Sequence, residues 1–95
     1  MAISRAEHMV TVERPDARKL QALKVSTWPI WTKQPSTFDW HYDEPEVCYV
    51  LEGEVVVTWA NGQASIRKGD LVTFPKDMSC TWHVKQAVRK RYRFG

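Results

Sequence analysis

Short strand-like runs separated by turn signals fill residues 28–94 of this chain. Residues 47–51 and 55–59 are two such runs, rich in β-branched and aromatic side chains. Asn61-Gly62, directly after the second run, predicts a β-hairpin with a type I′ turn. About eight short strands with turn signals at this spacing are typical of a sandwich or a barrel. The sequence therefore predicts an all-β fold.

One segment near the N-terminus has a different character. Pro15 precedes residues 16–23, which are rich in good helix formers. Their apolar positions form only a rough stripe, so the segment predicts one or two helical turns. We expect a short N-terminal helical segment before the strands.

The size of the chain limits it to one domain. Its 95 residues predict a single domain spanning residues 1–95, with the barrel at about residues 28–94. No segment approaches the roughly 20 apolar residues that span a bilayer, and the N-terminus lacks the apolar run of a secretory signal. These features predict a cytoplasmic location and no membrane partner. Cys48 and Cys80 are too few for a disulfide scaffold, and we expect them to be thiols.

Charge is unevenly distributed along the chain, whose formal net charge is +3. Residues 34–66 carry six acidic side chains and no Lys or Arg, whereas residues 67–95 carry eight basic side chains. Solvated faces of opposite sign explain this pattern; a basic patch for an anionic ligand or nucleic acid is the alternative. Arg89, Arg91 and Arg93 share one face, which is typical of an exposed strand protected by charge against edge pairing. Because no stacking platform stands beside them, we expect no nucleic-acid partner.

Two short motifs have the order and spacing of a known family. In residues 46–53 a Glu is followed seven residues later by a Gly, and in residues 69–75 a Gly is followed six residues later by a Pro. These segments resemble the end of the first cupin motif and the start of the second. The chain is similar to small single-domain cupins of the RmlC-like superfamily, and especially to the (S)-ureidoglycine aminohydrolase cupin domain group. The resemblance implies a cupin-type antiparallel β-barrel, or jelly roll.

The resemblance also implies a place for a metal. In metal-binding cupins, two His separated by one residue precede the motif Glu, and a third His follows the motif Pro. The matching positions in this chain are Asp39, His41, Glu46 and Cys80. Each is a legitimate ligand type for a divalent metal such as Mn, Fe, Zn or Ni, although two of the four depart from the family's usual residue. The alternative is a pocket that has lost its metal. Asp77 is a further departure, since the family usually has Gly there.

One strand alternates aromatic and polar side chains next to these positions. Phe38, Trp40 and Tyr42 share one face, and Asp39 and His41 share the other. The alternation alone favours burial of the aromatic face. The cupin resemblance instead favours Asp39 and His41 inside the barrel, with the aromatic side chains packed outside it. We expect the inward placement of Asp39 and His41.

The remaining pocket candidates each have a plainer alternative. Cys80 lies in phase with Trp82, so a buried, inert thiol is its more frequent state. A thiolate at Cys80 would need a metal or a protonated His41 beside it. Cys48, Trp59 and Trp82 are weaker candidates for the pocket lining, and core filling is the alternative for the two tryptophans.

Three functions fit these features. The first is a small cupin that binds a small organic molecule inside the barrel, with Asp39, His41, Glu46 and Cys80 as ligands of an assisting metal or as acid–base groups. The second is a non-catalytic binding or sensing domain. The third is a homodimer that associates through the aromatic strand. The sequence names no substrate and leaves open whether the protein is an enzyme, because one fold hosts many activities.

Overall fold

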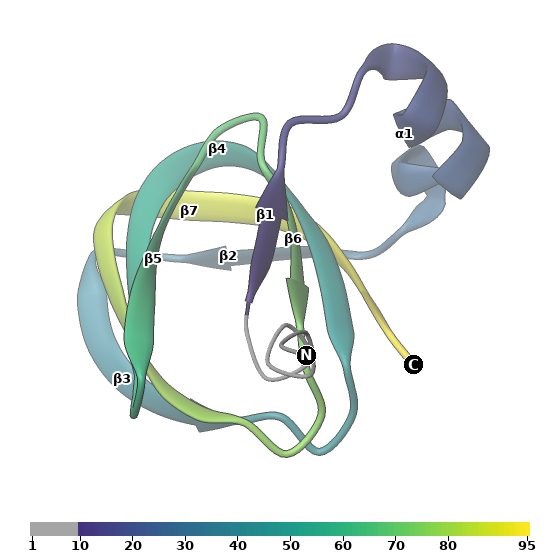
Figure 1. The fold of residues 1–95 in the computed structure, drawn as a ribbon. Helices are drawn as coiled ribbons and strands as arrows, with labels where there is room; N and C mark the ends of the chain where they lie inside the picture. Colours follow the sequence, from purple (N-terminus) through teal and green to yellow (C-terminus); the bar gives the residue numbers. More distant parts are fainter. Residues whose placement is uncertain (1–9) are drawn as a thin grey trace.

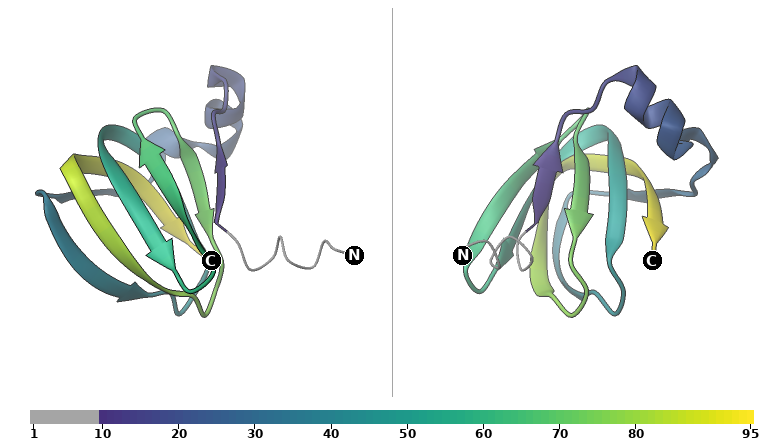
Figure 2. Two further views of the ribbon diagram at one scale, coloured as in Figure 1. Left: turned by 60° about the vertical axis from the view of Figure 1, so that its left-hand side comes forward. Right: turned by 45° about the vertical axis from the view of Figure 1, so that its right-hand side comes forward.

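The computed structural model describes residues 10–95, and antiparallel strands dominate it (Figure 1). In chain order the elements are β1 (Thr11–Glu13), α1 (Ala17–Leu23), the 3₁₀ turn η2 (Val25–Thr27), β2 (Ile30–Lys33), β3 (Ser36–His41), β4 (Glu46–Trp59), β5 (Gly62–Arg67), β6 (Leu71–Phe74) and β7 (Ser79–Phe94). The strands belong to one seven-stranded sheet. The sheet curls round into a barrel, as the views in Figure 2 show. The fold is an all-β cupin-type jelly roll, as predicted.

Two long strands, β4 and β7, form the centre of the sheet and pair with each other along most of their length. β6 and β5 lie in turn along the other edge of β4, and β2 and β3 lie along the other edge of β7. β1 extends the sheet beyond β6. The predicted runs 47–51 and 55–59 are therefore two halves of the single strand β4.

The two halves of β4 meet at Gly53, whose φ is +104°. The pairing of β4 with β7 shifts register on either side of this residue. A Cβ at Gly53 would lie 2.7 Å from the Cα of Val88 and still closer to the carbonyl oxygen of Ala87. Only glycine adopts this positive φ without strain and also lets the β7 backbone come this close without a clash. The motif glycine therefore lets β4 and β7 approach each other closely where the sheet curves.

β4 and β5 form the predicted hairpin, but the turn differs from the prediction. Trp59 pairs with Gly62, so the two-residue loop consists of Ala60 and Asn61. A type I′ turn needs positive φ at both loop residues, and neither of these has it. The type I′ prediction is wrong because Gly62 is already the first residue of β5 rather than part of the turn.

The predicted N-terminal helical segment is confirmed as α1. The side chain of Asp16 caps it by accepting a hydrogen bond from the backbone N–H of Lys19 at 2.9 Å. α1 and η2 lie outside the barrel (Figure 2). There Val25, Trp28 and Leu71 form a small second hydrophobic cluster. Neither helical segment of residues 10–95 has the length and apolar character of a membrane span.

The arginines of β7 lie in the middle of the sheet, because β7 has strands on both sides. The prediction of an exposed edge strand is therefore wrong. Arg91 donates a hydrogen bond to the carbonyl oxygen of Trp28 at 2.7 Å, and the guanidinium of Arg93 lies 5.0 Å from the centroid of the Trp28 ring. Arg89 lies 3.8 Å from a carboxylate oxygen of Glu52 on β4. Arg91 and Arg93 therefore hold Trp28 against the outer face of the sheet, and Arg89 joins β7 to β4 on that face.

The main hydrophobic core fills much of the barrel interior. It includes Cys48 and Val50 of β4, Phe74 of β6, and Val84 and Val88 of β7, all of them buried. Each comes from the inward phase of its strand, as period-two alternation requires. Next to this core the interior is not filled, and the unfilled part is the candidate site.

Candidate functional site inside the barrel

Strand β3 turns its aromatic face inward, which reverses the orientation expected from the cupin resemblance. In the pairing with β7, Phe38 lies opposite Trp82. Trp40 lies opposite Cys80, and opposed side chains project from the same face of a sheet. Tyr42 continues the phase and is 1% exposed. Burial of the aromatic face removes more apolar area from water than burial of the polar face would. β3 therefore follows the rule that the apolar face of an alternating strand is the buried one.

Asp39 and His41 lie on the outer face of β3, where β7 provides their partners. Asp39 accepts a hydrogen bond from the Thr81 hydroxyl at 2.9 Å. Nδ1 of His41 lies 2.8 Å from Oγ of Ser79, and about half of the His41 side chain is exposed. The expectation that Asp39 and His41 point into the barrel is therefore wrong. Ordinary cross-strand pairing explains both side chains without a ligand.

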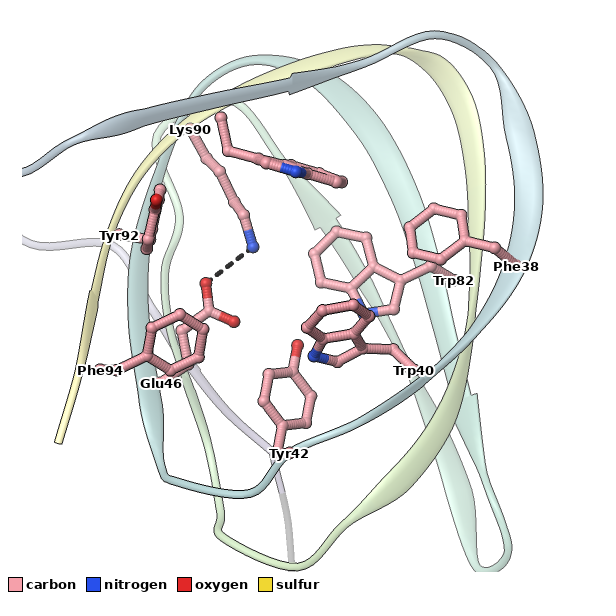
Figure 3. A pocket seen from close by; sticks show the side chains of 9 residues that line it. Phe38, Trp40, Tyr42, Glu46, Trp82, Lys90, Tyr92 and Phe94 are labelled. Carbon is pink, nitrogen blue, oxygen red and sulfur yellow. Dashed lines mark hydrogen bonds and ion pairs between the residues drawn. The ribbon is translucent and has the colours of Figure 1, made fainter.

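A cavity of about 200 Å³ lies inside the barrel (Figure 3). Seven aromatic side chains and one pair of opposite charges line it: Trp31, Phe38, Trp40, Tyr42, Trp82, Tyr92, Phe94, Glu46 and Lys90. Mostly apolar walls with a few polar groups are the usual composition of a small-molecule pocket. Of the residues that the sequence suggested, Glu46 and Trp82 lie on this wall.

Glu46 and Lys90 form the charged part of the cavity wall. Nζ of Lys90 lies 2.8 Å from Oε2 of Glu46. The Lys90 side chain is only 7% exposed, and the Glu46 side chain only 3%. The ammonium also lies 4.9 Å from the ring centroid of Trp31 and 4.5 Å from that of Trp82. These distances fit cation–π contacts. The cavity wall therefore holds one negative and one positive charge in direct contact.

Lys90 is a site residue that the sequence analysis missed, because it stands within a run of basic residues. Val88, Lys90 and Tyr92 occupy one phase of β7, and the arginines occupy the other. Val88 and Lys90 are both buried. The apolar residues two positions to either side are the signal that could have placed Lys90 inside the barrel.

Two buried polar atoms of the cavity wall make no well-formed hydrogen bond within residues 10–95. They are the hydroxyl of Tyr42 and the indole Nε1 of Trp82. Figure 3 shows the Tyr42 hydroxyl pointing into the cavity. Burial raises the pKa of Tyr42 far above its usual value, and the negative charge of Glu46 raises it further. The hydroxyl therefore stays protonated. Because buried donors are rarely left unpaired, a bound molecule with acceptor atoms would complete this wall.

The two cysteines are free thiols on the interior side of their strands. Burial is the main cause that raises the pKa of Cys48 to about 12 and that of Cys80 to about 11. Neither is ionised near neutral pH, and His41 lies on the opposite face from Cys80. Cys80 is therefore a small buried side chain rather than a thiolate. Cys48 belongs to the core, and Trp59 borders an open groove outside the cavity.

The four positions matched to the cupin metal ligands are divided between two places. Asp39 and His41 lie on the outer face of β3 and Cys80 is buried on the interior side of β7; these three border the open groove, whereas Glu46 lines the cavity and contacts Lys90. Across the described part of the chain, no three His, Cys, Asp or Glu side chains are grouped so that they could hold a metal ion. The donors present therefore do not fit the metal that the cupin resemblance implies.

The barrel, its motif glycines Gly53 and Gly69 at positive φ, and the cavity inside it define a cupin domain. The comparison with protein families agrees. This chain belongs to the EutQ-like cupin domain family, whose model matches residues 20–92. The finer resemblance to the (S)-ureidoglycine aminohydrolase group is not confirmed and stays a prediction.

Solved structures show the same fold. A DUF861-family protein from Thermotoga maritima is 51% identical over 92% of this chain and 100% of that chain, with a TM-score of 0.89. The EutQ protein of Clostridium difficile is 20% identical over 99% of this chain and 79% of that chain, with a TM-score of 0.65. An RmlC-like cupin from Shewanella frigidimarina is 15% identical over 68% of this chain and 64% of that chain, with a TM-score of 0.54. The similarity to the last two structures supports a shared fold only. A comparison with curated proteins found no match.

Proposed function

We propose that this protein is a small-molecule-binding cupin that holds its ligand in the barrel cavity against Glu46 and Lys90. The observation that carries the proposal is the ion pair on the cavity wall, with its 2.8 Å contact and almost complete burial. A sensing role and a catalytic role both begin with this binding step, so the proposal holds for either.

Stability alone is a poor explanation for the buried pair. Removing two charges from water costs several kcal/mol for each ion, and an apolar pair of similar volume is often about 1–4 kcal/mol more stable. Glu46 and Lys90 stand beside unfilled space, where they can exchange hydrogen bonds with a bound molecule. Ligand recognition therefore accounts for the pair better than stability does.

The cavity limits the size of the ligand and suggests how the ligand enters. Its volume of about 200 Å³ is below the roughly 300–1,000 Å³ that is usual for small-molecule pockets, which favours a small ligand. Trp40 and Phe94 line the cavity and are nevertheless 47% and 44% exposed. We therefore place the entrance beside these two side chains. The aromatic walls favour a flat molecule, and the charged wall orients its polar end.

The proposed binding uses the Lys90 ammonium as the positive charge beside the motif carboxylate of Glu46. In metal-binding cupins a divalent metal would supply that charge. No step of the proposal passes through a metal, because the oxygen, nitrogen and sulfur donors of Asp39, His41 and Cys80 lie outside the cavity lining.

A thermal-shift screen of small acids, amides, aldehydes and sugars tests the proposal. A ligand at about 100 times its Kd should raise the free energy of unfolding by about 2.7 kcal/mol. The shift should disappear in the double variant Glu46→Leu/Lys90→Met, whose fold is checked by near-ultraviolet circular dichroism. The outer-face control Asp39→Ala/His41→Ala should keep the full shift. A ligand whose thermal shift disappears in the outer-face variant but persists in the cavity variant would contradict the proposal.

Two other sequence predictions are separate from this proposal. A cytoplasmic location and a homodimer both stay predictions. A homodimer would need a surface other than the aromatic face of β3, since that face points into the barrel. Sedimentation over a range of concentrations measures the oligomeric state directly.

A further inference from the structure

We propose that Lys90 is a covalent nucleophile and that the cavity takes small aldehydes or ketones, which form an imine with Nζ of Lys90. This inference rests on the proposed function, because it requires the cavity to be the binding site. It goes further by naming the class of ligand, a carbonyl compound, and the bond that forms.

The surroundings of Lys90 suit a nucleophilic amine. Its side chain is 7% exposed, and its nitrogen lies 4.9 and 4.5 Å from the ring centroids of Trp31 and Trp82. Lysines that form Schiff bases are commonly withdrawn from water by hydrophobic walls of this kind. Lys90 also borders the unfilled space of the cavity, so a carbonyl carbon can reach its nitrogen.

Glu46 is placed to carry the proton that must leave Lys90 before it can react. Oε2 of Glu46 lies 2.8 Å from Nζ, within the reach required of a general base. Transfer of one proton along this contact converts the ammonium and the carboxylate into a neutral amine and a neutral acid. Both products are suited to the mostly apolar wall of this cavity.

The reaction balances without any other reagent. The lone pair of the Lys90 amine forms a bond to the carbonyl carbon while the C=O π electrons move to oxygen, and a proton passes from nitrogen to oxygen to give a carbinolamine. The protonated Glu46 then gives its proton to the carbinolamine hydroxyl, which leaves as water while the nitrogen lone pair forms the C=N bond. The products are a protonated imine, one water molecule and the Glu46 carboxylate. The charges at the end equal those at the start.

Tyr42 and Trp82 supply donors for the carbonyl oxygen. Both residues line the cavity, and their buried hydroxyl and indole N–H make no well-formed hydrogen bond within residues 10–95, although the indole lies close enough to Tyr42 and Cys80 to lower their pKa values slightly. Hydrogen bonds from them would polarise a carbonyl group and stabilise the oxygen as it gains negative charge. Because burial keeps the pKa of Tyr42 far above its usual value, this donor keeps its proton throughout the physiological range.

Lys33 provides a matched comparison within the same molecule. Its ammonium also lies near an aromatic ring, 5.2 Å from the centroid of Phe38. Unlike Lys90, Lys33 is exposed, and it makes no ion pair with a carboxylate of the described segment. Exposed amines normally react faster than buried ones, so chance modification would favour Lys33.

Reductive trapping of the intact protein tests the inference. The protein is incubated separately with acetaldehyde, benzaldehyde and pyruvate in the presence of sodium cyanoborohydride, and modified lysines are identified by peptide mass mapping. At least one probe should label Lys90 about tenfold or more faster than Lys33, despite the burial of Lys90. Failure of all three probes to label Lys90, or labelling no faster than at Lys33, would overturn the inference.

Variants identify the partners of Lys90. Lys90→Met should abolish the fast adduct and leave slow labelling of surface lysines. Glu46→Gln should slow the adduct by about a hundredfold, because the proton carrier is lost. If Glu46→Gln does not fold, Tyr42→Phe serves in its place: it removes one unpaired hydroxyl and should also slow labelling of Lys90. Labelling of Lys90 at the wild-type rate in a folded Glu46→Gln or Tyr42→Phe protein would contradict the role assigned to the substituted residue.

The two proposals can fail separately. A probe that raises the melting temperature of the wild-type protein, loses this effect in Glu46→Leu/Lys90→Met and never labels Lys90 would overturn the imine while supporting the binding site. A Lys90 adduct that forms equally fast in the unfolded chain in urea would overturn the inference, because the cavity would then contribute nothing.

Discussion

Glu46 and Lys90 make their buried 2.8 Å contact from neighbouring strands without being opposite each other in the sheet. Glu46 lies opposite Phe94, whereas Lys90 lies opposite Val50, several positions further along β4. The long side chain of Lys90 spans this diagonal through the barrel interior (Figure 3). The contact therefore depends on the register of β4 against β7, and it places both charges on the wall of the cavity.

The first prediction concerns the stability of this pair. Glu46→Leu and Lys90→Met should each lower the free energy of unfolding by about 3–5 kcal/mol, because the remaining charge stays buried without its partner. The double variant should recover most of that loss and reach or exceed wild-type stability, since apolar side chains then fill the site. Urea denaturation of the four proteins measures the coupling.

An exposed pair with the same geometry is the control for that experiment. Nζ of Lys19 also lies 2.8 Å from a carboxylate oxygen of Glu13, but the two side chains are 46% and 40% exposed. Lys19→Met should cost less than about 1 kcal/mol. Losses that simply add in the double variant Glu46→Leu/Lys90→Met would show that the buried pair is not a coupled unit.

Tyr42 yields a prediction in which stability and binding move in opposite directions. Tyr42→Phe removes a buried hydroxyl that has no partner within residues 10–95, so the unliganded protein should be unchanged or up to about 1 kcal/mol more stable. Affinity for a cavity ligand should fall by about fivefold or more, because one hydrogen bond is lost. Calorimetric titration measures the affinity, and thermal denaturation measures the stability.

Tyr92→Phe is the matched variant. Tyr92 also lines the cavity, but it is only partly buried, and its hydroxyl is not among the buried atoms without a partner. A larger loss of affinity in Tyr92→Phe than in Tyr42→Phe would place the ligand elsewhere in the cavity.

The sequence predicted the fold well because backbone requirements are local. Gly53 adopts a φ of +104° next to the β7 backbone, and Gly69 adopts +94°. A positive φ at each of these positions excludes most other residues, so the two motif glycines could be identified from the sequence. Asp77, where the resemblance leads one to expect Gly, also has a positive φ of +66°. Asp16 likewise marked the start of α1 through its capping side chain.

The site was only half predictable, because it depends on strand phase and on contacts distant in the sequence. Glu46 and Trp82 were identified, and the structure places both on the cavity wall. The resemblance gave the wrong phase for Asp39 and His41, since metal-binding cupins have ligands where this chain has solvent-facing side chains. Lys90 and Glu46 are 44 residues apart in the sequence, and no local sequence pattern predicts that two such distant residues form a pair.

The third prediction tests the close approach at Gly53. Gly53→Ala should lower the free energy of unfolding by about 3 kcal/mol or more, because a Cβ there meets the backbone of Ala87 and Val88 at a positive φ. Gly62→Ala should cost less than about 1 kcal/mol, since its φ is not positive and its nearest neighbour is the Trp59 side chain at 3.4 Å. Equal losses in urea denaturation would contradict the role assigned to Gly53.

The fourth prediction concerns alkaline pH. Burial raises the pKa of Cys48 from 9.0 to about 12 and that of Cys80 from 9.0 to about 11, so the folded protein keeps these protons after the unfolded chain has lost them. The resulting stability is fully present below about pH 9 and is lost as the pH rises towards the folded-state pKa values. Each thiol should contribute a decline of about 1.4 kcal/mol per pH unit in that window, and Tyr42 should add to it above about pH 10.

Urea denaturation between about pH 8 and pH 10.5 measures this decline. The variant Cys48→Ala/Cys80→Ala should be less stable at pH 8 but should show a shallower slope, because two of the titrating groups are gone. An unchanged slope in this variant would mean that other groups cause the alkaline loss.

The last prediction concerns metal removal. Treatment with EDTA should leave the melting temperature unchanged, and elemental analysis of tag-free protein should find no stoichiometric Mn, Fe, Zn or Ni. The reason is the placement of the donors: Glu46 is occupied by the Lys90 ammonium inside the barrel, while Asp39 and His41 pair with Thr81 and Ser79 on the outer face. A structural or catalytic metal site needs at least three protein ligands around one point. Stoichiometric metal that is lost in Glu46→Ala would contradict this assignment, because that carboxylate would then have to exchange its ammonium partner for the ion.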